Sequence, residues 1–202
     1  SSDVCSSDLK TVTFAGGASL PAPTAVGAVG VGDKLVIGAE TFYILSRDSA
    51  TQVTVQTAAT STHTNAAYAI TRAYNDIQAW ETGRQGDLVA EDRIEGGVAY
   101  KDGVFTPTTT ITIDGSENTD ATHYMSLTVA SGQRHNGTAG TGVIVDGSGF
   151  TTGQLFFVKD KYFRMEWLEI RNYPGDAATG QPINLNQGNA GNNLLSHLII
   201  HD

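Results

Sequence analysis

The chain has 202 residues and a formal net charge of −9, and only 16% of its residues are charged. This length allows one domain with a sizeable core, or a small domain and part of another. An acidic chain without a basic stripe repels phosphate backbones, so we expect no nucleic-acid partner. No apolar run reaches the roughly 18 residues that a membrane span needs, so we expect no span either.

The first nine residues read SSDVCSSDL and match, residue for residue, the translation of a common sequencing adapter. We therefore treat residues 1–9 as an artefact of an environmental assembly and draw nothing from the lack of a signal peptide. Cys5 lies in this segment, so we expect no disulfide or thiol chemistry. The chain stops directly after the apolar run Leu198–Ile200, and we expect the reading frame to be cut there too.

Short alternating segments follow, separated by Gly, Asp or Ser at intervals near ten residues. This pattern predicts a small all-β module over residues 10–73. Its strands are predicted at 11–14, 34–37, 41–45, 52–56 and 67–70.

The periodicity changes at Asn75, and residues 75–84 read as a short helix. Asn75 is its predicted N-cap, with Gln78 reaching back to the cap. Ile77 and Trp80 share one face. We expect this helix to cover the first strands of the β-structure that follows, because an uncovered edge invites strand addition.

Further strands are predicted at 97–100, 110–113, 124–129, 142–145, 155–158 and 181–186. The strongest signal is internal: residues 163–172 can be laid on residues 193–202 with an offset of 30. The apolar phase of the first copy shifts by one residue between Trp167 and Leu168. Such a shift indicates a bend between two strand directions.

Residues 74–202 resemble the beginning of right-handed parallel β-helix proteins of the pectin-lyase-like superfamily. The resemblance rests on the helix Asp76–Arg84, the segment Val98–Gly103, and the segments Leu168–Asn172 and Leu198–Asp202. It implies a capping helix and the first coils of a β-helix over residues 74–202. With the small β-module of residues 10–73 before them, the chain is expected to be all-β. The family includes polysaccharide lyases and hydrolases, phage tailspikes and adhesins.

Polar residues in the opposite phase to the apolar ones are predicted to line an outer face of the coils. One interpretation is a solvated face with weak ion pairs. The other is a polar groove for sugar hydroxyls with tyrosines as stacking platforms, lined also by the histidine that replaces Trp167 in the second copy. The candidate carbohydrate-binding residues are Tyr162, Glu166, Glu169, Arg171, Tyr173 and His197.

No catalytic residue is assigned. Lyases of this family hold calcium in acidic clusters, and its hydrolases use paired carboxylates, but the sequence displays neither arrangement. Residues 114–118 and 146–149 resemble pieces of calcium loops without the closing carboxylate, so turns are expected there. No metal ligand is assigned, and calcium stays a candidate cofactor only.

Histidines offer further candidates. His197, His201 and Asp202 are close in sequence, but packing is expected more than a metal or catalytic role, because His201 and Asp202 point to opposite faces of a strand. His123 and His135 are expected in loops or at the surface. Asn136-Gly137-Thr138 matches an N-glycosylation acceptor, and a turn explains it equally well.

We expect a non-catalytic β-helix, extracellular or on a cell surface, that presents a long face to a polysaccharide, a cell-surface glycan or another surface. One alternative is a polysaccharide lyase or glycoside hydrolase whose catalytic coils lie beyond residue 202. Another is a phage tailspike-like protein with residues 11–72 as its attachment module. The oligomeric state stays open.

Overall fold

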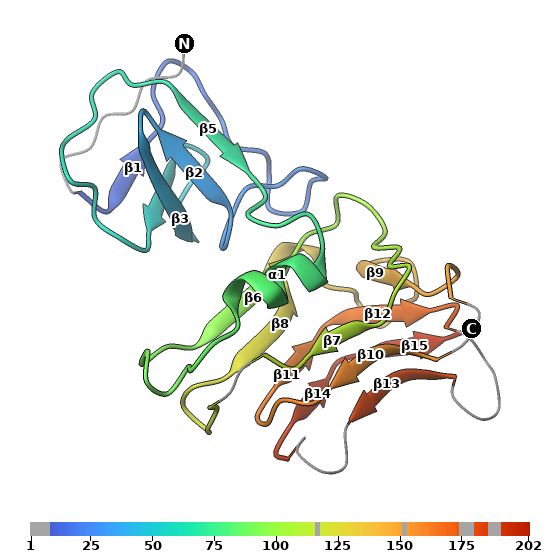
Figure 1. Cartoon of the computed structure of the whole chain (residues 1–202). Helices are drawn as coiled ribbons and strands as arrows, with labels where there is room; N and C mark the ends of the chain where they lie inside the picture. Colours follow the sequence, from blue (N-terminus) through green and yellow to red (C-terminus); the bar gives the residue numbers. More distant parts are fainter. Residues whose placement is uncertain (1–8, 116–117, 151–152, 174–179, 186–190) are drawn as a thin grey trace. The chain divides into compact units, whose positions relative to one another are not determined.

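The computed structural model describes residues 9–115, 118–150, 153–173, 180–185 and 191–202. The chain divides into two compact units, Ser1–Ala73 and Tyr74–Asp202 (Figure 1). Strands dominate both units, with one short α-helix among the described residues. The all-β prediction is therefore confirmed.

The first unit is a five-stranded antiparallel sheet with the order β1-β4-β3-β2-β5. All five predicted strands form, and the apolar side chains on one face of the sheet build the core, because alternate residues of β2 and β4 are buried. Leu9, which the sequence places in the artefact, joins this unit, since its carbonyl oxygen accepts a hydrogen bond of 2.7 Å from the Ala59 N–H. The strands are β1 (Thr11–Thr13), β2 (Lys34–Ile37), β3 (Glu40–Arg47), β4 (Gln52–Val55) and β5 (Tyr68–Thr71).

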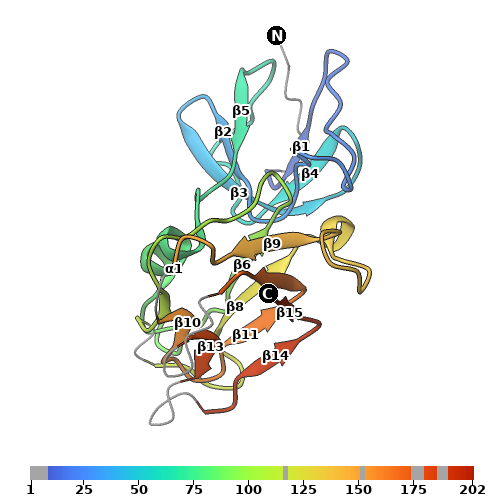
Figure 2. The same ribbon diagram turned by 90° about the vertical axis from the view of Figure 1, so that its right-hand side faces the viewer.

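The second unit contains three sheets whose neighbouring strands all run parallel (Figures 1 and 2). The first sheet holds β6 (Glu95–Ala99), β8 (Met125–Val129), β11 (Arg164–Glu166) and β14 (Leu194–Ser196). The second sheet holds β9 (Val143–Asp146), β12 (Leu168–Arg171) and β15 (Ile199–His201). The third sheet holds β7 (Ile111–Ile113), β10 (Gln154–Val158) and β13 (Gln181–Leu185).

The chain visits the three sheets in a fixed cyclic order, first, second, third and then first again. We call one such passage a circuit. In the earliest circuit, which runs from β6 to β7, Phe105 takes the place of a second-sheet strand through a parallel bridge to Val145. Side chains from all three sheets meet in one core cluster, with Phe156, Met165 and Ile170 fully buried.

The predicted repeat is confirmed by the strand register. Met165 in β11 pairs with Leu195 in β14, and Ile170 in β12 pairs with Ile200 in β15, each 30 residues further along. The predicted bend is also confirmed, because Trp167 alone separates β11 from β12 and these strands belong to different sheets.

Helix α1 (Ile77–Arg84) has its N-cap one residue later than predicted. Asp76, not Asn75, is the N-cap, and its carboxylate accepts a hydrogen bond of 2.7 Å from the Ala79 N–H. Gln78 does not reach back. Its side-chain amide instead pairs with Thr112 in β7, accepting from the N–H at 2.7 Å and donating to the carbonyl at 3.2 Å. The Gln78 side chain thus hydrogen-bonds the backbone N–H and C=O of one residue at the edge of the third sheet, as a further strand would.

The apolar face of α1 packs into the core of the second unit. Ile77 and Trp80, predicted to share this face, are both buried. A Cβ atom at Gly97 in β6 would lie 2.7 Å from the Trp80 ring, closer than any real contact. Gly97 is therefore required by the close approach of the indole.

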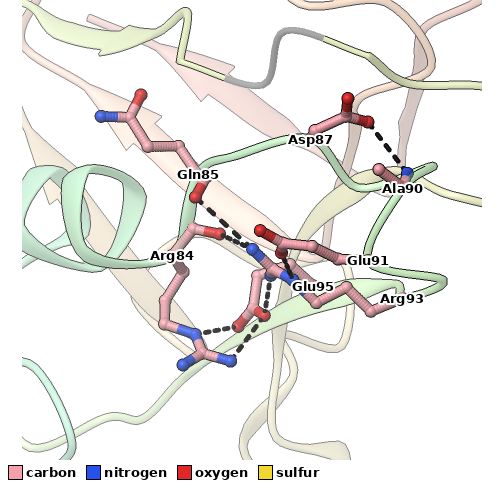
Figure 3. A network of polar contacts seen from close by, with 7 residues as sticks. All are labelled: Arg84, Gln85, Asp87, Ala90, Glu91, Arg93 and Glu95. Atoms are coloured by element: carbon pink, nitrogen blue, oxygen red, sulfur yellow. Dashed lines mark hydrogen bonds and ion pairs between the residues drawn. The ribbon is translucent and has the colours of Figure 1, made fainter.

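An ion network joins the end of α1 to the start of β6 (Figure 3). The buried Glu95 carboxylate accepts two hydrogen bonds of 2.9 Å from Arg84 and one of 2.6 Å from Arg93. Arg93 also donates to the Arg84 carbonyl oxygen at 2.9 Å and to the Glu91 carboxylate. The two guanidinium groups thus share one buried carboxylate.

We predict that Glu95→Gln lowers the free energy of unfolding of the second unit by about 1–2 kcal/mol, because two guanidinium groups lose their shared anion. The value lies below that of a fully buried pair, since the arginine side chains are 25% and 37% exposed. Urea unfolding followed by tryptophan emission measures it, because both tryptophans, Trp80 and Trp167, lie in this unit. The matched control is Glu91→Gln, which removes a half-exposed carboxylate and should cost under about 0.5 kcal/mol. Equal losses in the two variants would contradict the assignment.

Candidate functional site

The turns of the second unit place non-glycine residues in left-handed backbone. Apart from Asp92, these residues recur every five positions within a circuit and again in the next circuit. They lie two residues before a strand, between two strands or directly after a strand. Left-handed backbone costs an ordinary L-residue about 1 kcal/mol, so compensating contacts are expected. The residues and their φ angles are Tyr162 (58°), Trp167 (67°), Asn172 (51°), Asn192 (60°) and His197 (51°).

Trp167 and His197 occupy the same corner in consecutive circuits. Their rings are stacked, with centroids 4.0 Å apart and planes inclined by 12°. Trp167 is half-buried, and His197 is exposed. The offset of 30 residues places the two rings over each other because each follows a paired strand, β11 or β14, in parallel register.

A loop from an earlier circuit adds a second histidine and a cation. His135 follows the short 3₁₀ turn η1 (Ser131–Gln133), and its ring lies 5.5 Å from that of Trp167. Its Nε2 donates a hydrogen bond of 2.7 Å to the His197 carbonyl oxygen. The exposed Arg134 guanidinium lies 4.9 Å from the Trp167 ring centroid, within reach of a cation–π interaction.

A carboxylate and a hydroxyl complete the site. Ser196 donates a hydrogen bond of 2.8 Å to Glu166, and His197 Nδ1 lies 3.2 Å from the same hydroxyl oxygen. The corner therefore combines flat rings, a cation, an anion and a hydroxyl within contact of one another. We call this group the corner cluster: Arg134, His135, Glu166, Trp167, Ser196 and His197.

Of the six candidate residues predicted from the sequence, two belong to the corner cluster and four lie outside it. Glu166 and His197 belong to the corner cluster. Tyr162 lies at the opposite end of β11, where its N–H donates to the Gly191 carbonyl oxygen at 3.0 Å. Glu169 and Arg171 lie in β12 of the second sheet, and Tyr173 follows that strand.

Glu169 does not line a solvated face, so that prediction is wrong. The residue is fully buried, and its carboxylate accepts hydrogen bonds of 2.5 Å from the Gly140 N–H and 3.0 Å from His201 Nε2. The loop that contains Gly140 provides this cover over β12. Glu169 has the position of an outward-facing residue in its strand. It is buried nevertheless, because a loop distant in sequence lies against it.

Arg171 forms an ion pair with Asp146 of the preceding circuit. Its Nε donates to Asp146 at 2.8 Å, and Asn172 donates to the same carboxylate oxygen at 3.0 Å. The Ser148 N–H donates to the other oxygen at 2.9 Å. Burial raises the pKa of Asp146, but these hydrogen bonds outweigh it and hold the pKa below its usual range. Asp146 thus has protein partners, which fits the turn expected over residues 146–149.

The described residues give no support to a particular metal ligand set. Within them, no group of three or more His, Cys, Asp or Glu side chains is placed to hold a metal ion. In the candidate calcium segment 114–118, residues 116 and 117 lie outside the described residues, and Asp114 pairs with Lys159 at 2.7 Å. No helix in the described part of the chain is long and apolar enough to cross a membrane.

A groove of about 700 Å³ lies elsewhere in the second unit, beside the N-terminal end of α1. Its walls include Asp76, Gln78 and Thr82 from the helix region, with Phe105, Pro107 and Ile111 opposite. No sequence-predicted site residue lines it.

Comparison with family models, curated proteins and solved structures finds no match for this chain. The corner cluster must therefore be interpreted from its own geometry.

Sequence reasoning found half of the corner. The repeat places His197 on Trp167, and Glu166 was singled out by its phase. Arg134 and Ser196 were not predicted as site residues, and His135 was expected only in a loop or at the surface. The loop that holds Arg134 and His135 has no periodic signal, and the contact of His135 with His197 spans 62 residues.

We predict a raised pKa for His201, chiefly because it donates to the buried Glu169, while Arg171 opposes the effect. The stabilisation from this ion pair is complete below the ordinary histidine pKa of 6.5 and is lost as pH rises through the raised value. An NMR titration of wild type and Glu169→Gln checks this, with His201 returning towards its ordinary pKa in the variant. His123, whose pKa is raised by Asp92 and Asp120, is the internal control. A His201 pKa equal in the two proteins would contradict the assignment.

Proposed function

We propose that residues 74–202 are the beginning of a right-handed parallel β-helix of the pectin-lyase-like type. The supporting observation is the cyclic order in which the chain enters three parallel sheets. Repeats that stack in this way bury a continuous core and leave a long lateral surface. An experimental structure in which successive circuits wind left-handedly would contradict the proposal.

We propose further that this surface binds carbohydrate, in a non-catalytic protein that is secreted or exposed on a cell surface. The observation that carries the proposal is the stacked pair of Trp167 and His197 at an accessible corner. Flat rings pack against the apolar faces of sugar rings, and nearby polar groups fix their orientation through hydroxyls. Glu166 and Arg134 supply such groups beside the rings.

The repeat favours a polymer over a small sugar. Consecutive strands in a sheet are about 4.8 Å apart, a step comparable to the length of one sugar unit in a glycan chain. Trp167 and His197 occupy equivalent positions on consecutive circuits. An extended glycan along the corner would therefore meet the edge of one ring for each circuit it crosses, because the stacked faces cover each other.

We predict that soluble oligosaccharides perturb the NMR signals of the corner cluster, and that Trp167→Asn weakens their binding at least about tenfold. Asparagine suits this test because it tolerates left-handed backbone, so the ring is removed without adding strain. A neutral cello-oligosaccharide and an acidic oligogalacturonate are the two probes. Arg134→Gln should weaken binding of the acidic probe more than that of the neutral one.

Tyr124→Leu is the matched control. Tyr124 also contacts a guanidinium group, since the Arg164 carbon lies 3.8 Å from its ring centroid, but it lies outside the corner cluster. This variant should bind both probes as wild type does. Absence of binding, or equal affinity in wild type and Trp167→Asn, would refute a glycan site at the corner. Release of new reducing ends from pectin or alginate would refute the non-catalytic role.

A further inference from the structure

The loop that follows His135 contains the dipeptide Asn136-Gly137, with both residues exposed. The two ends of the loop are close together, because a Cβ atom at Gly142 would lie 2.8 Å from the His135 backbone nitrogen. Inside the loop, the Thr141 hydroxyl donates to the Thr138 carbonyl oxygen at 2.6 Å. The Asn-Gly peptide is therefore held in a closed, internally bonded loop.

The contacts of His135 determine which ring nitrogen carries its proton. Nε2 faces the His197 carbonyl oxygen at 2.7 Å, and a carbonyl oxygen only accepts, so Nε2 is protonated. In the neutral ring Nδ1 then carries a free lone pair. The Gly137 N–H donates to this Nδ1 at 3.3 Å. The buried imidazole thus places a proton acceptor on the backbone nitrogen that follows Asn136.

The side-chain carbonyl of Asn136 is polarised at the same time. Its Oδ1 accepts a hydrogen bond of 3.1 Å from the Thr138 N–H, and the Thr141 hydroxyl oxygen lies 3.1 Å from it. The Thr138 N–H stabilises negative charge that develops on this oxygen, whereas the Thr141 hydroxyl proton is already donated to the Thr138 carbonyl oxygen. A base on the nucleophile and a donor on the electrophile both promote acyl transfer.

We propose that Asn136 is a self-modifying site, at which the fold promotes conversion of asparagine to aspartate and isoaspartate. His135 Nδ1 takes the Gly137 amide proton as that nitrogen attacks Asn136 Cγ, and the electron pair of the Cγ=Oδ1 bond moves to Oδ1. The carbonyl then re-forms, the Cγ–Nδ2 bond breaks, and Nδ2 leaves as ammonia with the proton from His135. The product is a five-membered succinimide. Water adds to either of its carbonyl carbons and opens the ring, which gives aspartate or isoaspartate.

Local geometry supports each requirement of this reaction. Gly137 has no Cβ atom to hinder ring closure and has a left-handed φ of 91°, with no atom near a built Cβ. Exposure of Asn136 admits the water that opens the ring. Proximity of base and nucleophile in one closed loop lowers the entropic cost of reaching the reactive geometry.

Modification here would affect β12. Isoaspartate adds a methylene group to the backbone of the loop whose Gly140 N–H donates to the buried Glu169. Loss of that hydrogen bond would leave the carboxylate with one fewer partner. This inference does not depend on the proposed carbohydrate binding.

The test uses the full chain produced in bacterial cytoplasm, where N-glycosylation of Asn136 does not compete. The protein is incubated at neutral pH, and peptide mapping by mass spectrometry with fragmentation that distinguishes isoaspartate follows each asparagine. We expect Asn136 to convert several-fold faster than the same residue in a synthetic peptide of residues 131–142. An equal or slower rate in the folded protein would overturn the proposal.

Two variants examine the mechanism. His135→Gln keeps a donor for the His197 carbonyl oxygen but removes the base, and it should slow conversion several-fold. His123→Gln, a histidine outside the loop, should leave the rate unchanged. An unchanged rate in His135→Gln would overturn the role of His135.

A second measurement tests the proposal even if the His135→Gln variant does not fold, because it uses only the wild-type protein and the peptide. The peptide rate should rise in proportion to hydroxide concentration, whereas the rate in the folded wild type should rise less steeply, because an imidazole supplies the base. Parallel pH–rate profiles for wild type and peptide would also overturn the proposal.

Discussion

The second unit depends on one backbone constraint, a single residue with left-handed conformation between strands of different sheets. At Trp167 and again at His197 this residue turns the chain from the first sheet to the second. Because the neighbouring strands are parallel and 30 residues apart, the corners coincide and their rings stack. Stacking offsets the conformational cost that an aromatic residue meets in this backbone region.

Loops and helix α1 supply hydrogen-bond partners to groups that the strands of the three sheets do not pair. Gln78 provides a donor and an acceptor to the edge strand β7, and Glu95 holds two arginines where α1 passes into β6. The loop after His135 has two effects: it covers Glu169, and it places an imidazole against the corner rings. The proposed glycan platform and the proposed self-modifying asparagine are thus neighbours within one loop-and-corner arrangement.

Local periodicity predicted the strands, the repeat and the bend after Trp167, because each is encoded by apolar residues adjacent in sequence. Local periodicity could not predict contacts between segments that are distant in sequence. Glu169 has the phase of an outward residue, and only the loop around Gly140 buries it. The pairing of His135 with the His197 carbonyl joins residues 62 positions apart and leaves no periodic trace. The helix cap was misplaced by one residue because Asn75 and Asp76 are both good caps and only geometry selects between them.

The stacked corner is the central feature of this account, and NMR ring-current shifts test it most directly. Stacking at 4.0 Å should move the His197 ring protons upfield from ordinary histidine values. His63, which lies in the other unit and has its own edge contact with Phe42, is the control that the substitution should not move. In Trp167→Asn the His197 signals should return towards ordinary values while those of His63 stay in place. His197 ring shifts that are the same in wild type and Trp167→Asn would contradict the corner stack, and with it the surface proposed to bind glycan.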